Sequence, residues 1–218
     1  MKIVSLCVLL AGLKAMAAPC TRPDNSQSGH FPVTKNQFLL PSAPPDSSDW
    51  KKPITKEEWT RAVQYAAENG YSTDYLFLID MRIASGKKRF FVYNPKNDSV
   101  ELSGLVAHGS CNRHFLEEAR FSNQPNCGCS SVGKYKVGGA YHGEFGKSYR
   151  LFGLDSSNSN AFKRGIVLHG FDPVPDHEIY PESLCNSYGC PMVNRSFLSK
   201  LTDIIDRSPK PILLWIYE

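Results

Sequence analysis

The segment Ser187-Tyr188-Gly189-Cys190-Pro191 follows Val167-Leu168-His169-Gly170 in the chain, and Cys190 lies 21 positions after His169. A cysteine just after a glycine can occupy a tight turn, where its sulfur is exposed and backbone amides are close. A histidine that ends an apolar run is expected at the edge of a buried strand. Together they are the minimum groups for nucleophilic acyl transfer, because the imidazole generates a thiolate and amides stabilise the oxyanion. The spacing alone leaves open a buried structural cysteine and an unrelated core histidine.

The residues around this pair extend the pattern. The run from Asn160 to Gly170, followed by Ser-Tyr-Gly-Cys-Pro, resembles the signature of the murein L,D-transpeptidases with a YkuD-type catalytic domain. Four upstream segments resemble one branch of that family: Leu105–Gly109, Phe121–Asn123, Ser130–Tyr135 and Tyr141–Gly146. The resemblance covers roughly Tyr75 to Tyr217 and needs several ordered motifs to coincide, so it is fairly specific.

The resemblance implies a mainly β fold, a β-sandwich-like catalytic domain, with a cysteine nucleophile that acts on peptidoglycan stem peptides. Two positions depart from the family pattern. The family usually has Ser/Thr-His-Gly-Cys, and here Tyr188 replaces that histidine. Many members carry an arginine two residues after the cysteine, where this chain has Met192. Other groups must therefore do whatever those two side chains do for substrate binding.

The expected mechanism has two steps. Cys190 attacks the carbonyl of an L-centre that is followed by a D-residue, while His169 takes the thiol proton and passes it to the leaving amine. The carbonyl of Gly170 is expected to hold the imidazole tautomer, and amides of Cys190, Gly189 and Tyr188 to form the oxyanion hole. The thioacyl enzyme is then released by an amine or by water, and the sequence does not choose between these acceptors.

Four further residues are candidates for substrate binding. Ser187 adjoins the nucleophile turn, and the resemblance places His142, in a Gly-rich turn, near the cleft. Arg164 could hold a substrate carboxylate through a bidentate contact, although a surface arginine is nearly as good an interpretation. Asn160 precedes the histidine strand as Arg164 does. His108 also ends a strand-like run, and a structural role is the better prediction for it.

Two alternatives to a transpeptidase stay open. One is an L,D-carboxypeptidase or another Cys-His peptidase that acts on peptidoglycan, and the other is a non-catalytic wall-binding module of the same fold. The intact Cys-His pair argues against the second. A zinc site is disfavoured, because the chain has no C-x-x-C pair and its histidines match no familiar ligand spacing. We expect neither a metal nor a cofactor.

Length and composition fit one exported domain. The 218 residues suffice for a single core, and 41% hydrophobic with 11% aromatic residues excludes a largely disordered chain. Lys2 precedes an apolar run, Ile3–Leu13, and Ala15-Met16-Ala17 offers a cleavage site, which together predict a signal peptide over 1–17. We therefore expect the protein in the periplasm or cell wall. Cys20 makes a lipoprotein conceivable, but the residue before it, a proline, disfavours that reading.

Charge and hydropathy argue against nucleic-acid binding and against a membrane span. Cleavage after residue 17 removes Lys2 and Lys14, so the formal charge falls from +4 to +2, and no Lys/Arg cluster suggests nucleic-acid binding. No later run reaches about 18 apolar residues, so no membrane span is expected. Residues 18–53 are rich in Pro, Ser, Asn and Asp and are predicted to be a flexible leader, with the catalytic domain over 54–218. We expect a monomer.

Within the predicted domain, Thr55-Lys56-Glu57-Glu58 is a capping box that starts an amphipathic helix, and Asn194 can cap a last helix. A final strand at Pro211–Tyr217 is expected at the centre of the sheet. The other predicted strands are Tyr75–Met81, Arg89–Tyr93, Val100–Ala107, Lys134–Tyr141, Tyr149–Leu154 and Gly165–His169.

Six cysteines survive the predicted cleavage. If Cys190 is the nucleophile, the other five allow at most two internal disulfides and leave one odd thiol. Cys127 and Cys129 are too close to bridge comfortably to each other, so each is expected to bond elsewhere, with Cys111 and Cys185 as candidates.

Overall fold

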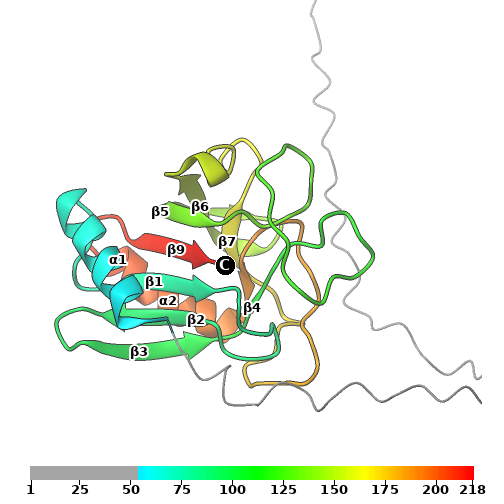
Figure 1. Cartoon of the computed structure of the whole chain (residues 1–218), viewed down its shortest axis with the longest axis horizontal. Coiled ribbons are helices and arrows are strands. Elements are labelled where there is room, and N and C mark those ends of the chain that lie inside the picture. The colour runs from blue at the N-terminus through cyan, green and yellow to red at the C-terminus, as the bar shows by residue number, and fades with distance from the viewer. Residues whose placement is uncertain (1–53) are drawn as a thin grey trace, which may run out of the picture.

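The computed structural model describes residues 54–218, which fold into a nine-stranded sheet with two α-helices (Figure 1). The elements in chain order are α1 (Lys56–Glu68), β1 (Leu76–Asp80), β2 (Phe90–Asn94), β3 (Ser99–Gly104), β4 (Val106–Ala107), β5 (Gly133–Gly143), β6 (Gly146–Gly153), the 3₁₀ helix η2 (Ser156–Asn158), β7 (Val167–Gly170), β8 (Met192–Val193), α2 (Arg195–Arg207) and β9 (Leu213–Tyr217). The predicted signal peptide and leader lie outside the described residues. Among residues 54–218, no helix is long and apolar enough to cross a membrane.

All nine strands belong to one sheet with the order β3-β2-β1-β9-β5-β6-β7-β8-β4. Two neighbouring pairs are parallel, β1 with β9 and β7 with β8, and the other pairs are antiparallel. Strand β9 has neighbours on both sides and lies near the middle of the order. This confirms the predicted central position of Pro211–Tyr217.

The two edge strands are consecutive in the chain. Strand β3 ends at Gly104 and β4 begins at Val106, so Leu105 alone connects opposite edges of the sheet, which must therefore curl until it nearly closes. The prediction of one continuous strand over Val100–Ala107 is wrong. The strand breaks because residues up to Gly104 pair with β2, whereas Val106 and Ala107 pair with β8 at the opposite edge. Gly104 itself passes close to α2, since a Cβ there would lie 2.6 Å from the ring of Phe197.

Strand β1 shows how the sheet divides the interior. Its side chains alternate, so Phe77 and Ile79 pack in the cluster that includes α2, whereas Leu76 and Leu78 pack in the cluster that includes α1. In Figure 1 the two helices accordingly lie on opposite sides of the strands. The structure confirms the expected mainly β fold with an N-terminal and a C-terminal helix.

Both helices begin where their capping residues predict. The Thr55 hydroxyl accepts a hydrogen bond from the Glu58 amide at 3.3 Å, and the Glu58 carboxylate accepts one from the Thr55 amide at 2.8 Å. At α2, the Asn194 side chain accepts a hydrogen bond from the Ser196 amide at 2.8 Å. These bonds involve residues two or three apart, which is why the sequence reveals them.

Five other predicted strands correspond to β1, β2, β5, β6 and β7, with boundaries that differ by up to three residues. Strand β8 was not predicted. It has only two residues, Met192 and Val193, which is too short to show an alternating pattern. It matters for the site because it begins two residues after Cys190 and pairs with the strand that carries His169.

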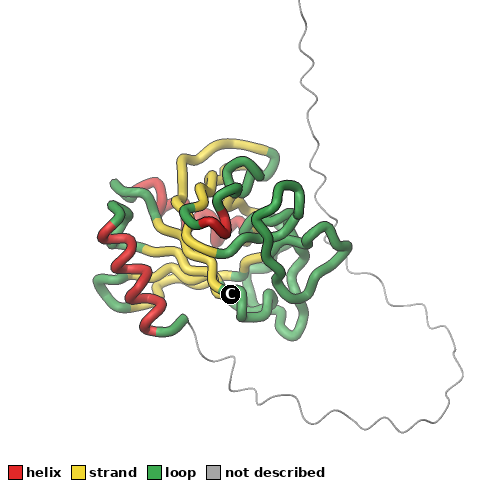
Figure 2. The backbone as a smooth tube through the Cα atoms, turned by 45° about the horizontal axis from the view of Figure 1, so that its top comes forward, coloured by secondary structure: helices red, strands yellow, loops and turns green. Residues whose placement is uncertain are grey.

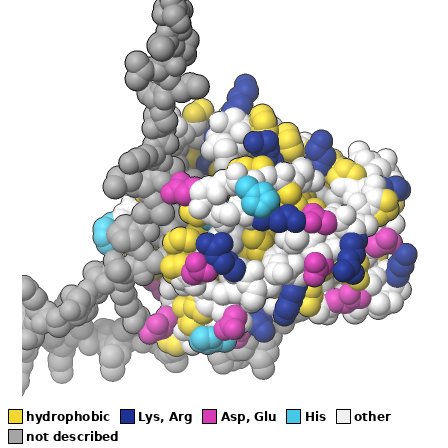
Figure 3. Space-filling model, turned by 180° about the vertical axis from the view of Figure 1, so that it is seen from behind, with side chains coloured by type: hydrophobic (Ala, Val, Ile, Leu, Met, Phe, Trp, Pro, Cys, Tyr) yellow, Lys and Arg dark blue, Asp and Glu magenta, His cyan; other side chains and the backbone are white. Residues whose placement is uncertain are grey.

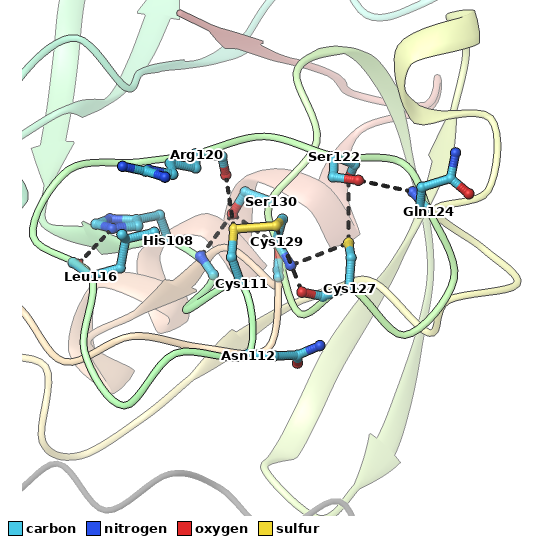
Figure 4. Close-up of a disulfide and its surroundings, with 12 residues drawn as sticks. His108, Cys111, Asn112, Leu116, Arg120, Ser122, Gln124, Cys127, Cys129 and Ser130 are labelled. Atoms are coloured by element: carbon cyan, nitrogen blue, oxygen red, sulfur yellow. Dashed lines mark hydrogen bonds between the residues drawn. A yellow bond between two sulfur atoms is a disulfide. The ribbon is translucent and has the colours of Figure 1, made fainter.

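The long connection between β4 and β5 is held by a disulfide between Cys111 and Cys129, whose Cα atoms are 4.2 Å apart (Figure 4). Cys185 is also disulfide-bonded. Cys127 and Cys190 are free thiols. The expectation that Cys129 bonds away from its neighbour is confirmed, and the same expectation for Cys127 is wrong. Figure 2 shows that the long loops gather on the side of the sheet away from α1.

Charged side chains of both signs are interspersed on the face that Figure 3 shows. Several basic groups have acidic partners, including the pairs Lys134–Asp155, Lys147–Asp206 and Arg195–Asp172. This face therefore presents no single-sign stripe of the kind that binds nucleic acid.

Candidate active site

His169 lies on β7 and faces away from the core that contains α2. Leu168 points into that core, so the alternation of the strand turns Val167 and His169 to the opposite face. The His169 side chain is buried, and its Nδ1 lies 3.2 Å from the carbonyl oxygen of Gly170. Because a carbonyl only accepts, Nδ1 carries the proton and Nε2 keeps its lone pair. The contact expected between Gly170 and the imidazole is thus present.

Phe145 holds the other side of the imidazole. Its ring stacks on that of His169, with centroids 4.1 Å apart and planes inclined by 24°. The Phe145 carbonyl accepts a hydrogen bond from Arg195 at 3.2 Å, and Arg195 in turn binds Asp172. Phe145 was not among the predicted site residues, because a phenylalanine at the tip of a hairpin carries no local signal for this role.

Cys190 follows a turn that requires glycine. Gly189 has φ 112°, and a Cβ there would lie 2.5 Å from the carbonyl oxygen of Cys129. The hydroxyl of Ser187 accepts a hydrogen bond from the Gly189 amide at 3.1 Å and donates one to the Cys190 carbonyl at 2.7 Å. Ser187, predicted to bind substrate, therefore uses its hydroxyl to close the turn.

This geometry predicts the effect of Gly189→Ala. The positive φ should cost about 1–3 kcal/mol, and the clash with the Cys129 carbonyl should displace the turn that presents the thiol. We expect a lower Tm and a larger loss of activity than Gly70→Ala produces. Gly70 is a matched control, because its φ is also positive, at 74°, but a Cβ there meets nothing within 4 Å. Equal activity of the two variants would contradict the proposed effect on the turn.

The thiol of Cys190 and the imidazole of His169 line the same cavity, which has a volume of about 290 Å³. Cys190 Sγ accepts a hydrogen bond from the Val167 amide at 3.4 Å and lies 3.9 Å from the carbonyl oxygen of Gly165. His169 lies two residues beyond Val167 on the same face of β7. No direct hydrogen bond joins these two described side chains, and catalytic hydrogen bonds are often long before substrate binds.

Burial sets the protonation states of both groups. It lowers the pKa of His169 to about 4, with the Gly170 carbonyl opposing this shift and Arg195 adding to it. Burial raises the pKa of the Cys190 thiol to about 11, against the opposing effects of the Val167 amide and of Arg164. Near neutral pH the pair is therefore an uncharged thiol and an uncharged imidazole that is ready to accept a proton.

A pH profile tests this description. Below its pKa His169 already carries a proton and cannot act as a base, so kcat/KM should rise through an apparent pKa near 4 instead of the ordinary 6.5. Towards pH 11 the thiol proton needed by the leaving amine is lost, so the rate should fall. Both values belong to the coupled pair. Activity measured from pH 3.5 to 11, with circular dichroism at each pH, is the test, and an acid limb near 6.5 would contradict it.

Two amides near the thiol are free to donate. Among the described residues, the backbone N–H groups of Tyr188 and Cys190 have no hydrogen-bond acceptor, whereas that of Gly189 binds the Ser187 hydroxyl. Of the three amides expected in the oxyanion hole, two therefore remain available. Tyr188 also lines the cavity with an exposed side chain.

Arg164 lines the cavity, but its guanidinium is used within the protein. It donates to the carbonyls of Ser122 and Cys129 and to the hydroxyl of Ser131, so it ties the disulfide-bonded loop to the segment that precedes β7. Asn160 does not line the cavity. Its amide groups bind Asn123 at 3.0 and 3.1 Å. The geometry thus gives both residues hydrogen-bond partners within the protein, and their contact with substrate stays a prediction.

Two other histidines lie outside the cavity. His142 is exposed, and its neighbours Tyr141 and Gly143 line the cavity while His142 does not. His108 is fully buried, with Nδ1 2.9 Å from Arg89 and Nε2 3.0 Å from the Leu116 carbonyl. The structural role predicted for His108 agrees with these contacts. Within residues 54–218 no three His, Cys, Asp or Glu side chains are grouped to hold a metal.

Comparisons with known proteins identify the family of this chain. The family model of the L,D-transpeptidase catalytic domain matches residues 47–217. None of the curated proteins matches the chain. An L,D-transpeptidase structure from Xylanimonas cellulosilytica is 15% identical and covers 71% of this chain and 68% of its own, with a TM-score of 0.41. An L,D-transpeptidase structure from Mycobacterium smegmatis is 10% identical and covers 66% of this chain and 59% of its own, with a TM-score of 0.40.

A third structure, the helical cell shape determining protein Pgp2 from Campylobacter jejuni, is 13% identical and covers 77% of this chain and 56% of its own, with a TM-score of 0.41. The present chain thus spans between about half and two thirds of these solved chains. The family model, in contrast, covers well over half of this chain. The chain belongs to the L,D-transpeptidase catalytic domain family.

Proposed function

We propose that this protein is a peptidoglycan L,D-transpeptidase with Cys190 as its nucleophile and His169 as its general base and acid. The observation that carries the proposal is that both side chains line one cavity, while the Nδ1 contact with Gly170 leaves Nε2 free to accept a proton. Membership of the family supports stem peptides as substrates.

In the first step the Cys190 side chain turns from the Val167 amide towards His169. The thiol proton passes to Nε2 as Sγ attacks the carbonyl carbon of the L-centre, and the oxyanion accepts hydrogen bonds from the amides of Tyr188 and Cys190. The C–N bond then breaks, Nε2 returns the proton to the leaving amine, and a thioester remains on Cys190.

In the second step an acceptor amine attacks the thioester and gives its proton to His169. The tetrahedral intermediate collapses, the new amide leaves, and the Cys190 thiol regains its proton. Water in place of the amine would make the enzyme a carboxypeptidase. Phe145 and Phe171 contribute apolar surface to the cavity, which favours exclusion of water and hence the amine acceptor.

Mass spectrometry of muropeptides tests the proposal. The protein without residues 1–17 is incubated with a defined tetrapeptide muropeptide, with and without a free D-amino acid. Cross-linked dimers or exchanged D-amino acids are the expected products. Shortened stems alone would instead identify a carboxypeptidase, and no change would identify a non-catalytic wall-binding module.

We also propose that the protein works as a monomer outside the cytoplasm, in the periplasm or cell wall. The support for this compartment is the signal-peptide pattern over 1–17 together with family membership. Fractionation of cells that express the full chain, with N-terminal sequencing of the exported form, tests the compartment and the cleavage after residue 17.

A further inference from the structure

The carboxylates of the proposed donor peptide call for a cationic group beside the cavity, and the residues that line the cavity offer no free one. A stem peptide that ends in a D-residue carries carboxylates near the bond to be cleaved, and arginine is the side chain that best matches a carboxylate. At the position where many family members have arginine, this chain has the buried Met192. Arg164 and Arg195 lie nearby, but both guanidinium groups already hold partners within the protein.

Arg150 does not line this cavity, but it neighbours two residues that do, Val167 and Tyr141. It is on β6 directly opposite Val167 on β7, and side chains that oppose each other in an antiparallel pair lie on the same face, with Cβ atoms about 5 Å apart. Val167 lines the cavity, and its amide holds the Cys190 thiol. The strand pairing therefore brings the stem of Arg150 beside the residue that positions the nucleophile.

Tyr141 connects Arg150 to the cavity. The Arg150 guanidinium lies 4.7 Å from the centre of the Tyr141 ring, and Tyr141 itself lines the cavity. Burial raises the pKa of Tyr141, and Cys190 and Arg150 act on it in opposite directions, as expected for a hydroxyl close to both groups. Tyr141 thus contacts the Arg150 guanidinium and also lines the cavity that holds the thiol.

The guanidinium of Arg150 is available to a ligand. The side chain is exposed, and no carboxylate or carbonyl within residues 54–218 binds it. The Tyr141 ring restrains the plane of the guanidinium while its edge N–H groups remain free, which reduces the entropy lost when a bidentate contact forms.

We propose that Arg150 binds a carboxylate of the donor stem peptide. This inference rests on the proposed function, because it assigns a subsite of the same cavity. The two candidate ligands are the terminal carboxylate of the D-residue and the side-chain carboxylate of the residue before it. They share one chemistry, and amidation of each in turn distinguishes them.

The test measures kcat/KM of the wild-type protein and of Arg150→Gln on three synthetic tetrapeptide stems: the free acid, the C-terminal amide and the side-chain amide. A charge-assisted hydrogen bond is worth about 1.5–3 kcal/mol, so Arg150→Gln should lose roughly 10–100-fold on the free acid. On the stem whose relevant carboxylate is amidated, the two proteins should be equally active. Arg150→Lys should lose less, since it keeps the charge but not the bidentate geometry.

Arg61→Gln is the matched control, because it removes the same charge from an exposed arginine on α1, and no residue of α1 lines the cavity. It should retain wild-type rates on all three stems. Equal losses of Arg150→Gln on all stems, or no loss on any, would overturn the inference. Wild-type turnover reports separately on the proposed function. If it is absent, binding of the three stems to Cys190→Ala, with and without Arg150→Gln, still decides whether Arg150 holds a carboxylate.

Discussion

Replacing Cys190 with alanine should abolish transfer, with a loss of at least about 10⁴-fold in kcat, while the fold remains intact. The side chain supplies the attacking atom, and no other described thiol lines the cavity. When the nucleophile is lost, the remaining amides and substrate contacts stabilise only a slow attack by water. Muropeptide exchange followed by mass spectrometry gives the rate, and circular dichroism reports on the fold.

Cys127→Ala is the control for this substitution. Cys127 is also a free, partly buried thiol, but its Sγ lies 3.7 Å from the Ser122 carbonyl within the disulfide-bonded loop and does not line the cavity (Figure 4). The Cys127→Ala protein should exchange muropeptides at the wild-type rate. An active Cys190→Ala protein would remove the basis of the whole mechanism.

The second large effect is expected for His169. His169→Ala should lose roughly 10²–10⁴-fold in kcat/KM, the usual contribution of a general acid–base group. His169→Gln keeps a similar volume and a donor to the Gly170 carbonyl but cannot accept and return a proton, so it should lose as much while folding normally. Equal losses of kcat/KM in the two variants would show that the missing proton transfer causes the loss, and that lost packing against Phe145 does not.

His177→Ala is the matched control for the imidazole, because His177 is exposed and pairs with Asp176 away from the cavity. The His177→Ala protein should have the kcat/KM of the wild type. A near-normal rate for both His169 variants would assign the base to another histidine, and His142 would be the first to substitute, since its neighbours line the cavity.

Many features of this protein could be predicted because they depend on residues close together in the chain. The capping bonds at Thr55 and Asn194 span two or three residues, and the contact between His169 and the Gly170 carbonyl spans one. Glycine before Cys190 predicted a tight turn, and Gly189 indeed has a positive φ. Each of these follows from local backbone geometry, which neighbouring residues control.

The face of the β5–β6 hairpin that meets the cavity could not be predicted in this way. If β5 alternated strictly from Lys134 and Lys136, His142 would share their face, on which the cavity lies. A bulge between Val137 and Ala140 shifts the register, so Tyr141 takes that face and His142 the other. One extra residue in a strand reverses every side chain beyond it, and the pairing with β6 decides where that residue is accommodated.

The roles of the arginines could not be predicted from local sequence either. Arg164 precedes the histidine strand in sequence and was the natural candidate for a substrate carboxylate, yet it binds carbonyls of Ser122 and Cys129, more than thirty residues away. Arg150 has no motif around it, but antiparallel pairing sets it opposite Val167, whose amide binds the thiol. Local sequence specifies the turns, caps and nucleophile. Which cations remain free beside that nucleophile depends on contacts between distant segments, which form only when the sheet closes around α2.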